Sequence, residues 1–155
     1  PLRRIADDET RIAERQLAHV TPFGALTLKN GVPIGYIQLD ITGRVAAVSY
    51  NTFPTFRNGE AARVFARALA MARHVLGARS FSIEPYQLGR GNHEAIESGA
   101  WWFYFKLGFR PRDAEARRLA RRELAHLRAA ASYRSSDATL IELARAHLYF
   151  DPRRR

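Results

Sequence analysis

Three strand-like segments open the patterned part of the chain. Residues 34–40 alternate between apolar and polar side chains, and residues 23–28 and 45–51 are rich in apolar and β-favouring residues. Asn30 and Gly31 separate the first two segments, and this dipeptide is strongly preferred in two-residue hairpin turns. The pattern predicts an antiparallel meander of three consecutive strands. A short helix is predicted before it, over residues 5–19.

The hydrophobic period lengthens after Pro54. Residues 59–76 have the spacing of an amphipathic helix, and Gly77 is well suited to end it. The apolar face of this predicted helix comprises Val64, Ala68, Leu69, Ala72, Val75 and Leu76. Residues 80–86 follow as a fourth strand, which Pro85 interrupts. A helix that joins two strands of one sheet predicts a right-handed parallel crossover.

Helices are expected over most of the remaining chain. The first spans residues 92–107, with Asn92 as its N-cap. Its predicted core stripe comprises Ile96, Gly99, Ala100, Phe103 and Leu107. The next helix covers residues 114–131 and is capped by Asp113. The last covers residues 138–149 and is capped by Ser135, Ser136 or Asp137. The fold class is therefore α/β (α+β), with a mostly antiparallel sheet.

The composition favours one folded domain. The chain has 155 residues, 46% of them hydrophobic, and no cysteine, which excludes disulfides, thiolate metal sites and cysteine nucleophiles. The five histidines lack metal-ligand spacing, so no metal site is expected. No apolar run approaches the ~20 residues that cross a bilayer, and the N-terminal residues 1–4 show no signal peptide. We therefore expect a cytoplasmic protein without a membrane partner.

The formal net charge of +10 raises the alternative of nucleic-acid binding. The arginines that would contact phosphate are Arg110, Arg112, Arg117, Arg118, Arg121 and Arg122. Glu115 and Glu123 are interspersed among them, and residues 110–131 contain no aromatic side chain on which bases could stack. We therefore expect a solvated or partner-docking helix and no specific nucleic-acid partner.

The turn before the helix at residues 59–76 is a candidate anion site. A helix N-terminus carries unpaired N–H groups and partial positive charge, and glycine lets a phosphate approach the backbone. Gly59 lies at this turn, and Arg57 and Arg63 add positive charge. An ordinary loop with a glycine is the alternative interpretation of the same residues.

A second motif lies at the end of the helix at residues 92–107. It consists of Tyr104, Lys106, Leu107, Gly108 and Phe109, in the pattern Y-x-K-L-G-F. Together with Gly59 and Ala61 in a strand–turn–helix context, this motif resembles the GNAT superfamily of acyl-CoA-dependent N-acyltransferases, over about residues 23–110. The resemblance implies a GNAT-like core over residues 1–110 and an arginine-rich helical extension over residues 111–155, docked on that core.

The sequence also departs from the family pattern. Phe56 stands where the loop motif usually has Arg or Gln, and Glu97 stands where asparagine is common. Only one helix fits before residue 23, so the family's first strand is not expected, and the chain is consistent with a segment of a larger protein. Helices over residues 113–149 replace the family's last two strands. These departures keep a second interpretation open, in which the chain is an inactive GNAT-like interaction module.

The resemblance also implies the members of a site. Acetyl-CoA or another acyl-CoA is the expected cosubstrate, with its diphosphate over residues 57–62. The implied cofactor-binding residues are Ser49, Asn51, Arg57, Asn58, Gly59, Glu60, Ala61 and Ala62. Tyr104 would protonate or hydrogen-bond the departing thiolate, with packing as its alternative role, and Glu84 and Glu97 are candidate bases. The acceptor would be a small-molecule or protein amine, and neighbouring domains or a second copy of the chain are open as further partners.

Overall fold

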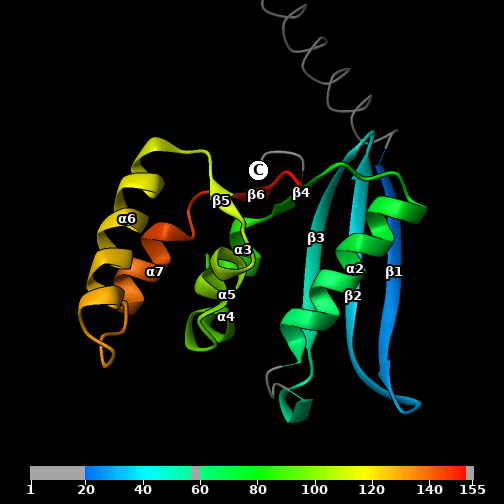
Figure 1. Cartoon of the computed structure of the whole chain (residues 1–155), viewed down its shortest axis with the longest axis horizontal. Helices are drawn as coiled ribbons and strands as arrows, with labels where there is room; N and C mark the ends of the chain where they lie inside the picture. The colour runs from blue at the N-terminus through cyan, green and yellow to red at the C-terminus, as the bar shows by residue number, and fades with distance from the viewer. Residues whose placement is uncertain (1–19, 57–59, 153–155) are drawn as a thin grey trace, which may run out of the picture.

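A six-stranded sheet with the strand order β1-β2-β3-β4-β6-β5 organises the molecule. The computed structural model describes residues 20–56 and 60–152 (Figure 1). The helix expected over residues 5–19 lies outside this part. The strands are β1 (Val20–Lys29), β2 (Val32–Thr42), β3 (Val45–Thr52), β4 (Ser80–Ile83), β5 (Arg110–Pro111) and β6 (Leu148–Phe150). The helices are η1 (Pro54–Phe56), α2 (Ala61–Val75), α3 (Pro85–Leu88), α4 (His93–Glu97), α5 (Ala100–Lys106), α6 (Ala114–Ala129) and α7 (Asp137–Leu143).

The predicted meander is confirmed. Strands β1, β2 and β3 pair antiparallel in succession. Asn30 and Gly31 adopt φ values of 51° and 80°, which the two central residues of a type I′ turn require. Ile37, Leu39 and Val48 are buried on the sheet face that packs with α2. The alternation seen in the sequence therefore places one face of the meander in the core.

Helix α2 carries the chain from β3 to β4, and these two strands pair in parallel as predicted. Its buried side chains are Phe65, Leu69 and Ala72. The prediction that Val75 belongs to the apolar face is wrong, because Val75 is 67% exposed. These three side chains lie at positions i, i+4 and i+7 and form one buried stripe, and Val75 lies to one side of this stripe.

The helix predicted over residues 92–107 is two helices, α4 and α5. Gly99 breaks it with a φ of 66°, a left-handed value that a residue inside an α-helix does not adopt. The break also changes which side chains are buried. Trp101 and Tyr104 enter the core, whereas Phe103 only packs partly buried against it. The strand predicted over residues 80–86 likewise ends early, because Pro85 begins α3.

The C-terminal part both completes the sheet and adds helices. Helices α6 and α7 form as predicted, capped by the Asp113 and Ser136 side chains, which accept bonds from Ala116 N and Thr139 N. The predicted helix over residues 138–149 is wrong beyond Leu143. Leu148–Phe150 is strand β6, which pairs with β4 on one side and β5 on the other. The expectation that helices replace the last two strands is therefore wrong.

Hydrogen bonds attach α6 and α7 to α5. Trp101 donates from Nε1 to the Leu143 carbonyl at 3.2 Å, inside the core. Trp102 donates to Ser135 Oγ at 3.1 Å, and Ser135 donates to the buried Glu123 carboxylate at 2.7 Å. Because a buried carboxylate needs hydrogen-bond partners, this network fixes the helical pair against the element that carries Tyr104.

Candidate active site

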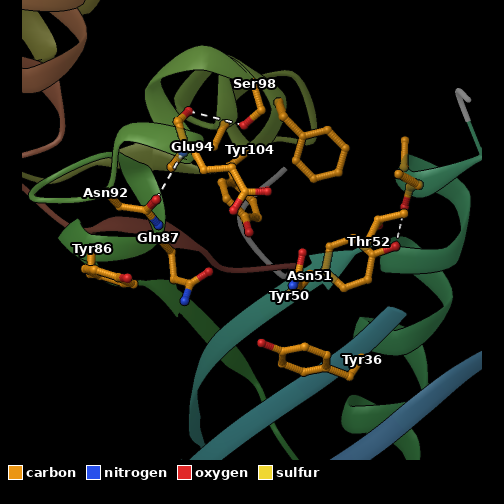
Figure 2. Close-up of a pocket in the computed structure, with 15 residues that line it drawn as sticks. Tyr36, Tyr50, Asn51, Thr52, Tyr86, Gln87, Asn92, Glu94, Ser98 and Tyr104 are labelled. Atoms are coloured by element: carbon orange, nitrogen blue, oxygen red, sulfur yellow. Dashed lines mark hydrogen bonds between the residues drawn. The ribbon is translucent and has the colours of Figure 1, made fainter. Parts of the chain in front are cut away.

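A pocket lies where β3 and β4 diverge. β4 pairs with β3 only over Val45–Ala47, so the second half of β3 runs on beyond its parallel neighbour. A pocket of about 510 Å³ occupies this fork, a volume within the range of small-molecule sites. Figure 2 shows Tyr50 and Asn51 of β3 on one side, with Tyr86 and Glu94 of the helices α3 and α4 on the other.

The first turn of α2 forms one end of the pocket. Ala61 and Ala62 line it, and the backbone N–H groups of a first helical turn have no intrahelical acceptor. Glu60 makes no capping bond to this turn. Its carboxylate instead accepts a 2.6 Å bond from Lys29, which lowers the pKa of Glu60. The Glu60 side chain therefore does not cap the N-terminus of α2. The side chains of Ala61 and Ala62 at this N-terminus are small enough for a ligand to reach the backbone.

Tyr104 forms a buried wall of the pocket. Its side chain is 3% exposed and contacts the rings of Phe65, Phe103 and Phe109, with centroids 5.5, 5.2 and 5.9 Å away. Its hydroxyl makes no hydrogen bond to any residue that the structure describes. Burial, and secondly the neighbouring Tyr50, raise the pKa of Tyr104 far above its ordinary value. Tyr104 therefore keeps its proton at neutral pH and can donate a hydrogen bond into the pocket.

The two predicted base candidates lie away from this wall. Glu84 is exposed at the start of α3, and Glu97 is exposed on α4, where it lies 3.4 Å from His93 Nδ1. Neither lines the pocket. Of the predicted cofactor-binding residues, Asn51, Ala61 and Ala62 line it, but Ser49 and Glu60 do not. The remaining three, Arg57, Asn58 and Gly59, fall outside the described residues.

Several pocket residues were missed by the sequence interpretation. They are Tyr36, Tyr50, Thr52, Tyr86, Gln87, Asn92, Glu94 and Ser98. Glu94 is the only charged side chain among the described lining residues. The available signal was its place two residues after the Asn92 cap, at the start of the predicted helix over residues 92–107 that also contains Tyr104. The tyrosines gave no sequence signal, because they come from three separate elements.

The described residues form neither a metal-binding cluster nor a membrane-spanning helix. Over residues 20–56 and 60–152, no group of three His, Cys, Asp or Glu side chains could hold a metal ion. In the same part of the chain, no helix combines the length and the apolar character needed to cross a membrane.

Solved structures that are similar to this chain in fold include N-acetyltransferases. No protein-family model and no curated protein matches the sequence. The Campylobacter jejuni N-acetyltransferase PseH, alone or in complex with acetyl coenzyme A, superposes with a TM-score of 0.52 at 12% identity, over 94% of this chain and 79% of that chain. A chimera of the spermidine N-acetyltransferase SpeG from Vibrio cholerae and hSSAT gives a TM-score of 0.48 at 17% identity, over 69% of this chain and 65% of that chain. The likeness is one of fold, and the chain has the predicted GNAT fold.

Proposed function

We propose that this GNAT-fold chain is an acyl-CoA-dependent N-acyltransferase. One observation carries the proposal: the pocket at the β3–β4 fork joins a helix N-terminus that the Glu60 side chain does not cap to a buried tyrosine hydroxyl. The first feature suits an anionic cosubstrate, and the second suits a leaving group that gains negative charge. The PseH structure with acetyl coenzyme A has the same fold, which supports the choice of cosubstrate.

The cosubstrate has two kinds of group that fit the fork. The diphosphate of acyl-CoA would lie over the first turn of α2, where Ala61 and Ala62 line the pocket. The pantetheine arm carries two amides, and a peptide-like amide can pair with a strand edge as an added strand would. The part of β3 beyond Ala47 offers such an edge, because β4 no longer pairs with it.

The chemistry at the thioester end is direct acyl transfer. A neutral amine nitrogen attacks the acyl carbonyl carbon, a C–N bond forms, and the C–S bond breaks. The nitrogen loses one proton, which either passes to the departing sulfur to give the thiol or goes to water when the sulfur leaves as thiolate. A thiol has a pKa of about 8.5, below that of Tyr104, so a full proton transfer from Tyr104 to the sulfur is unfavourable. Tyr104 would therefore stabilise the departing thiolate with a hydrogen bond.

The proposal is tested by binding and by thiol release. Titration calorimetry with acetyl-CoA and with desulfo-CoA should detect binding, and Gly59→Val should weaken it with little change in melting temperature, because the added side chain keeps the diphosphate from the backbone. A thiol reagent can follow turnover directly, since the chain contains no cysteine. Absence of acetyl-CoA and CoA binding at millimolar ligand would overturn the proposal. Binding without thiol release across a broad amine panel would favour the inactive module.

The predicted bases Glu84 and Glu97 allow a second test. Because both carboxylates are exposed and outside the pocket, we expect Glu84→Gln and Glu97→Gln to leave kcat within about 2-fold of the wild-type value. Steady-state thiol release with a working amine measures this. A loss of ~10²-fold or more in either variant would instead assign that carboxylate a role in proton transfer.

A further inference from the structure

The pocket at the fork is lined from both faces of the sheet. Side chains of successive strand residues point to opposite faces, and Ile37 is buried on the face that packs with α2. Tyr50 lies opposite Ile37 in the strand pairing and therefore shares this face. Tyr36 and Asn51 are paired with each other and lie on the other face, and both line the pocket. The pocket therefore extends from the first turn of α2 through the fork to the sheet face opposite α2.

Aromatic side chains are prominent in this pocket. The described lining residues include the rings of Tyr36, Tyr50, Tyr86, Phe103 and Tyr104. Two of them, Tyr36 and Tyr86, are 44% and 58% exposed, whereas the other three are buried or half-buried. Figure 2 shows Tyr86 on the helical side of the pocket and Tyr36 on the strand side. The two exposed rings therefore lie on opposite sides of the pocket mouth.

These two exposed rings contribute little to the packing of the fold. Neither is among the described side chains that form or flank the core. Within the described part of the chain, Tyr36 has one ring neighbour, Phe53, with centroids 6.5 Å apart, and Tyr86 has none. Leu26 of β1 lies opposite Tyr36 in the strand pairing and is 64% exposed, so the apolar surface continues beyond the mouth. Contiguous exposed apolar surface is typical of a ligand-binding groove.

The two ends of the pocket suit different substrates. The first turn of α2 is the proposed diphosphate site, so acyl-CoA would occupy the side of the sheet that α2 covers. The acceptor amine would then approach the thioester from the mouth, with its non-reacting part beside Tyr36 and Tyr86. Tyrosine rings pack with other aromatic rings in stacked or edge-to-face geometry, and such pairs gain more than their buried area alone provides.

We propose that the acceptor is a primary amine with an aromatic ring, which packs against Tyr36 and Tyr86 at the pocket mouth. The inference rests on the proposed acyltransferase function and adds the acceptor class to it. The ring stays at the mouth, and a short aliphatic arm carries the nitrogen inward to the acyl carbonyl. The ring takes no part in bond making or breaking, so its effect is on binding and orientation of the acceptor.

A matched series of acceptors tests the preference for an aromatic ring. 2-Phenylethylamine and 2-cyclohexylethylamine share a two-carbon arm and a six-membered ring, and ethylamine lacks the ring. At saturating acetyl-CoA, we expect kcat/KM per neutral amine to be ~3–10-fold higher for 2-phenylethylamine than for 2-cyclohexylethylamine. The value for ethylamine should be lower than that for 2-phenylethylamine by ~10-fold or more. Because the saturated ring is the more hydrophobic one, burial alone favours the opposite order. Equal values for the two ring compounds, or a higher value for the saturated one, would overturn the proposal.

Variants at the two exposed tyrosines locate the preference. Tyr36→Phe and Tyr86→Phe keep the rings and should retain the preference for 2-phenylethylamine. Tyr36→Leu and Tyr86→Leu remove a ring, and each should lower kcat/KM for 2-phenylethylamine by ~3–10-fold more than that for ethylamine. Ile141→Ala truncates a 47% exposed side chain on α7 outside the pocket, and as the control it should leave all three values unchanged. An equal loss with every acceptor in the leucine variants would overturn the role of the rings in acceptor choice.

Direct binding separates this inference from the acyltransferase proposal. Calorimetry compares 2-phenylethylamine with 2-cyclohexylethylamine, on the protein saturated with CoA and on the free protein. Binding of 2-phenylethylamine that weakens in Tyr36→Leu and Tyr86→Leu, without any acetyl-CoA binding, would overturn only the acyltransferase function. Acetyl-CoA binding or turnover with no preference for the aromatic ring would overturn only the aromatic acceptor site.

Discussion

Replacing Tyr104 by phenylalanine is expected to lower kcat by ~10²–10⁴-fold, the range for a lost proton donor or hydrogen bond at the reacting atoms. The ring is buried against Phe65, Phe103 and Phe109, and Tyr104→Phe keeps these contacts. No described residue hydrogen-bonds the hydroxyl, so its removal breaks no bond within that part of the fold. Acetyl-CoA affinity and melting temperature should therefore stay close to the wild-type values. Thiol release, calorimetry and thermal unfolding measure the three quantities.

Two results would contradict this role for Tyr104. Unchanged kcat in Tyr104→Phe would show that the hydroxyl has no role in turnover and that Tyr104 contributes only to packing. A large loss of stability with unchanged kcat would show that the hydroxyl has a structural partner instead. A pH profile gives an independent check, because the raised pKa of Tyr104 keeps the hydroxyl protonated beyond the ordinary tyrosine value of about 10. The stability that this raised pKa contributes is present below pH ~10 and is lost at higher pH, and Tyr104→Phe should lack this alkaline loss.

Local sequence signals predicted the elements that depend on local chemistry. Asn30 and Gly31 specify their hairpin turn because both central positions need positive φ. Asn92, Asp113 and Ser136 cap their helices through side-chain oxygens, which is a property of the residue and its two or three successors. The Y-x-K-L-G-F ending indicated both the GNAT fold and the position of Tyr104.

Features that depend on distant residues were not predictable in the same way. Leu148–Phe150 forms a strand because β4 and β5 lie on either side of it, although the preceding residues favour a helix. Gly99 could be accommodated within a helical pattern, and only its positive φ separates α4 from α5. Glu94 and Glu97 lie one helical turn apart, and the sequence could not determine which of them faces the fork.

The buried ring that supports Tyr104 gives the largest expected effect on stability. Phe65 is 0% exposed and contacts Tyr50 of β3, Tyr104 of α5 and Phe109, with ring centroids 5.1, 5.5 and 6.0 Å away. It therefore connects α2 with both sides of the fork. Phe65→Ala should lower the free energy of unfolding by about 3–5 kcal/mol, since it removes the apolar contacts and leaves a cavity.

The same substitution should also impair turnover, for a different reason from Tyr104→Phe. With Phe65 absent, the Tyr104 ring can shift into the cavity, and a hydroxyl misplaced by about 1 Å can cost ~10²-fold in rate. Val75→Ala is the control on the same helix, because Val75 is 67% exposed and its truncation should change the free energy of unfolding by less than about 0.5 kcal/mol. Denaturant unfolding and thiol release under conditions where each variant stays folded measure both effects. A loss of less than about 1 kcal/mol in the free energy of unfolding of Phe65→Ala would contradict close packing around Phe65. Truncation of a large, closely packed buried ring lowers that free energy by more than this amount.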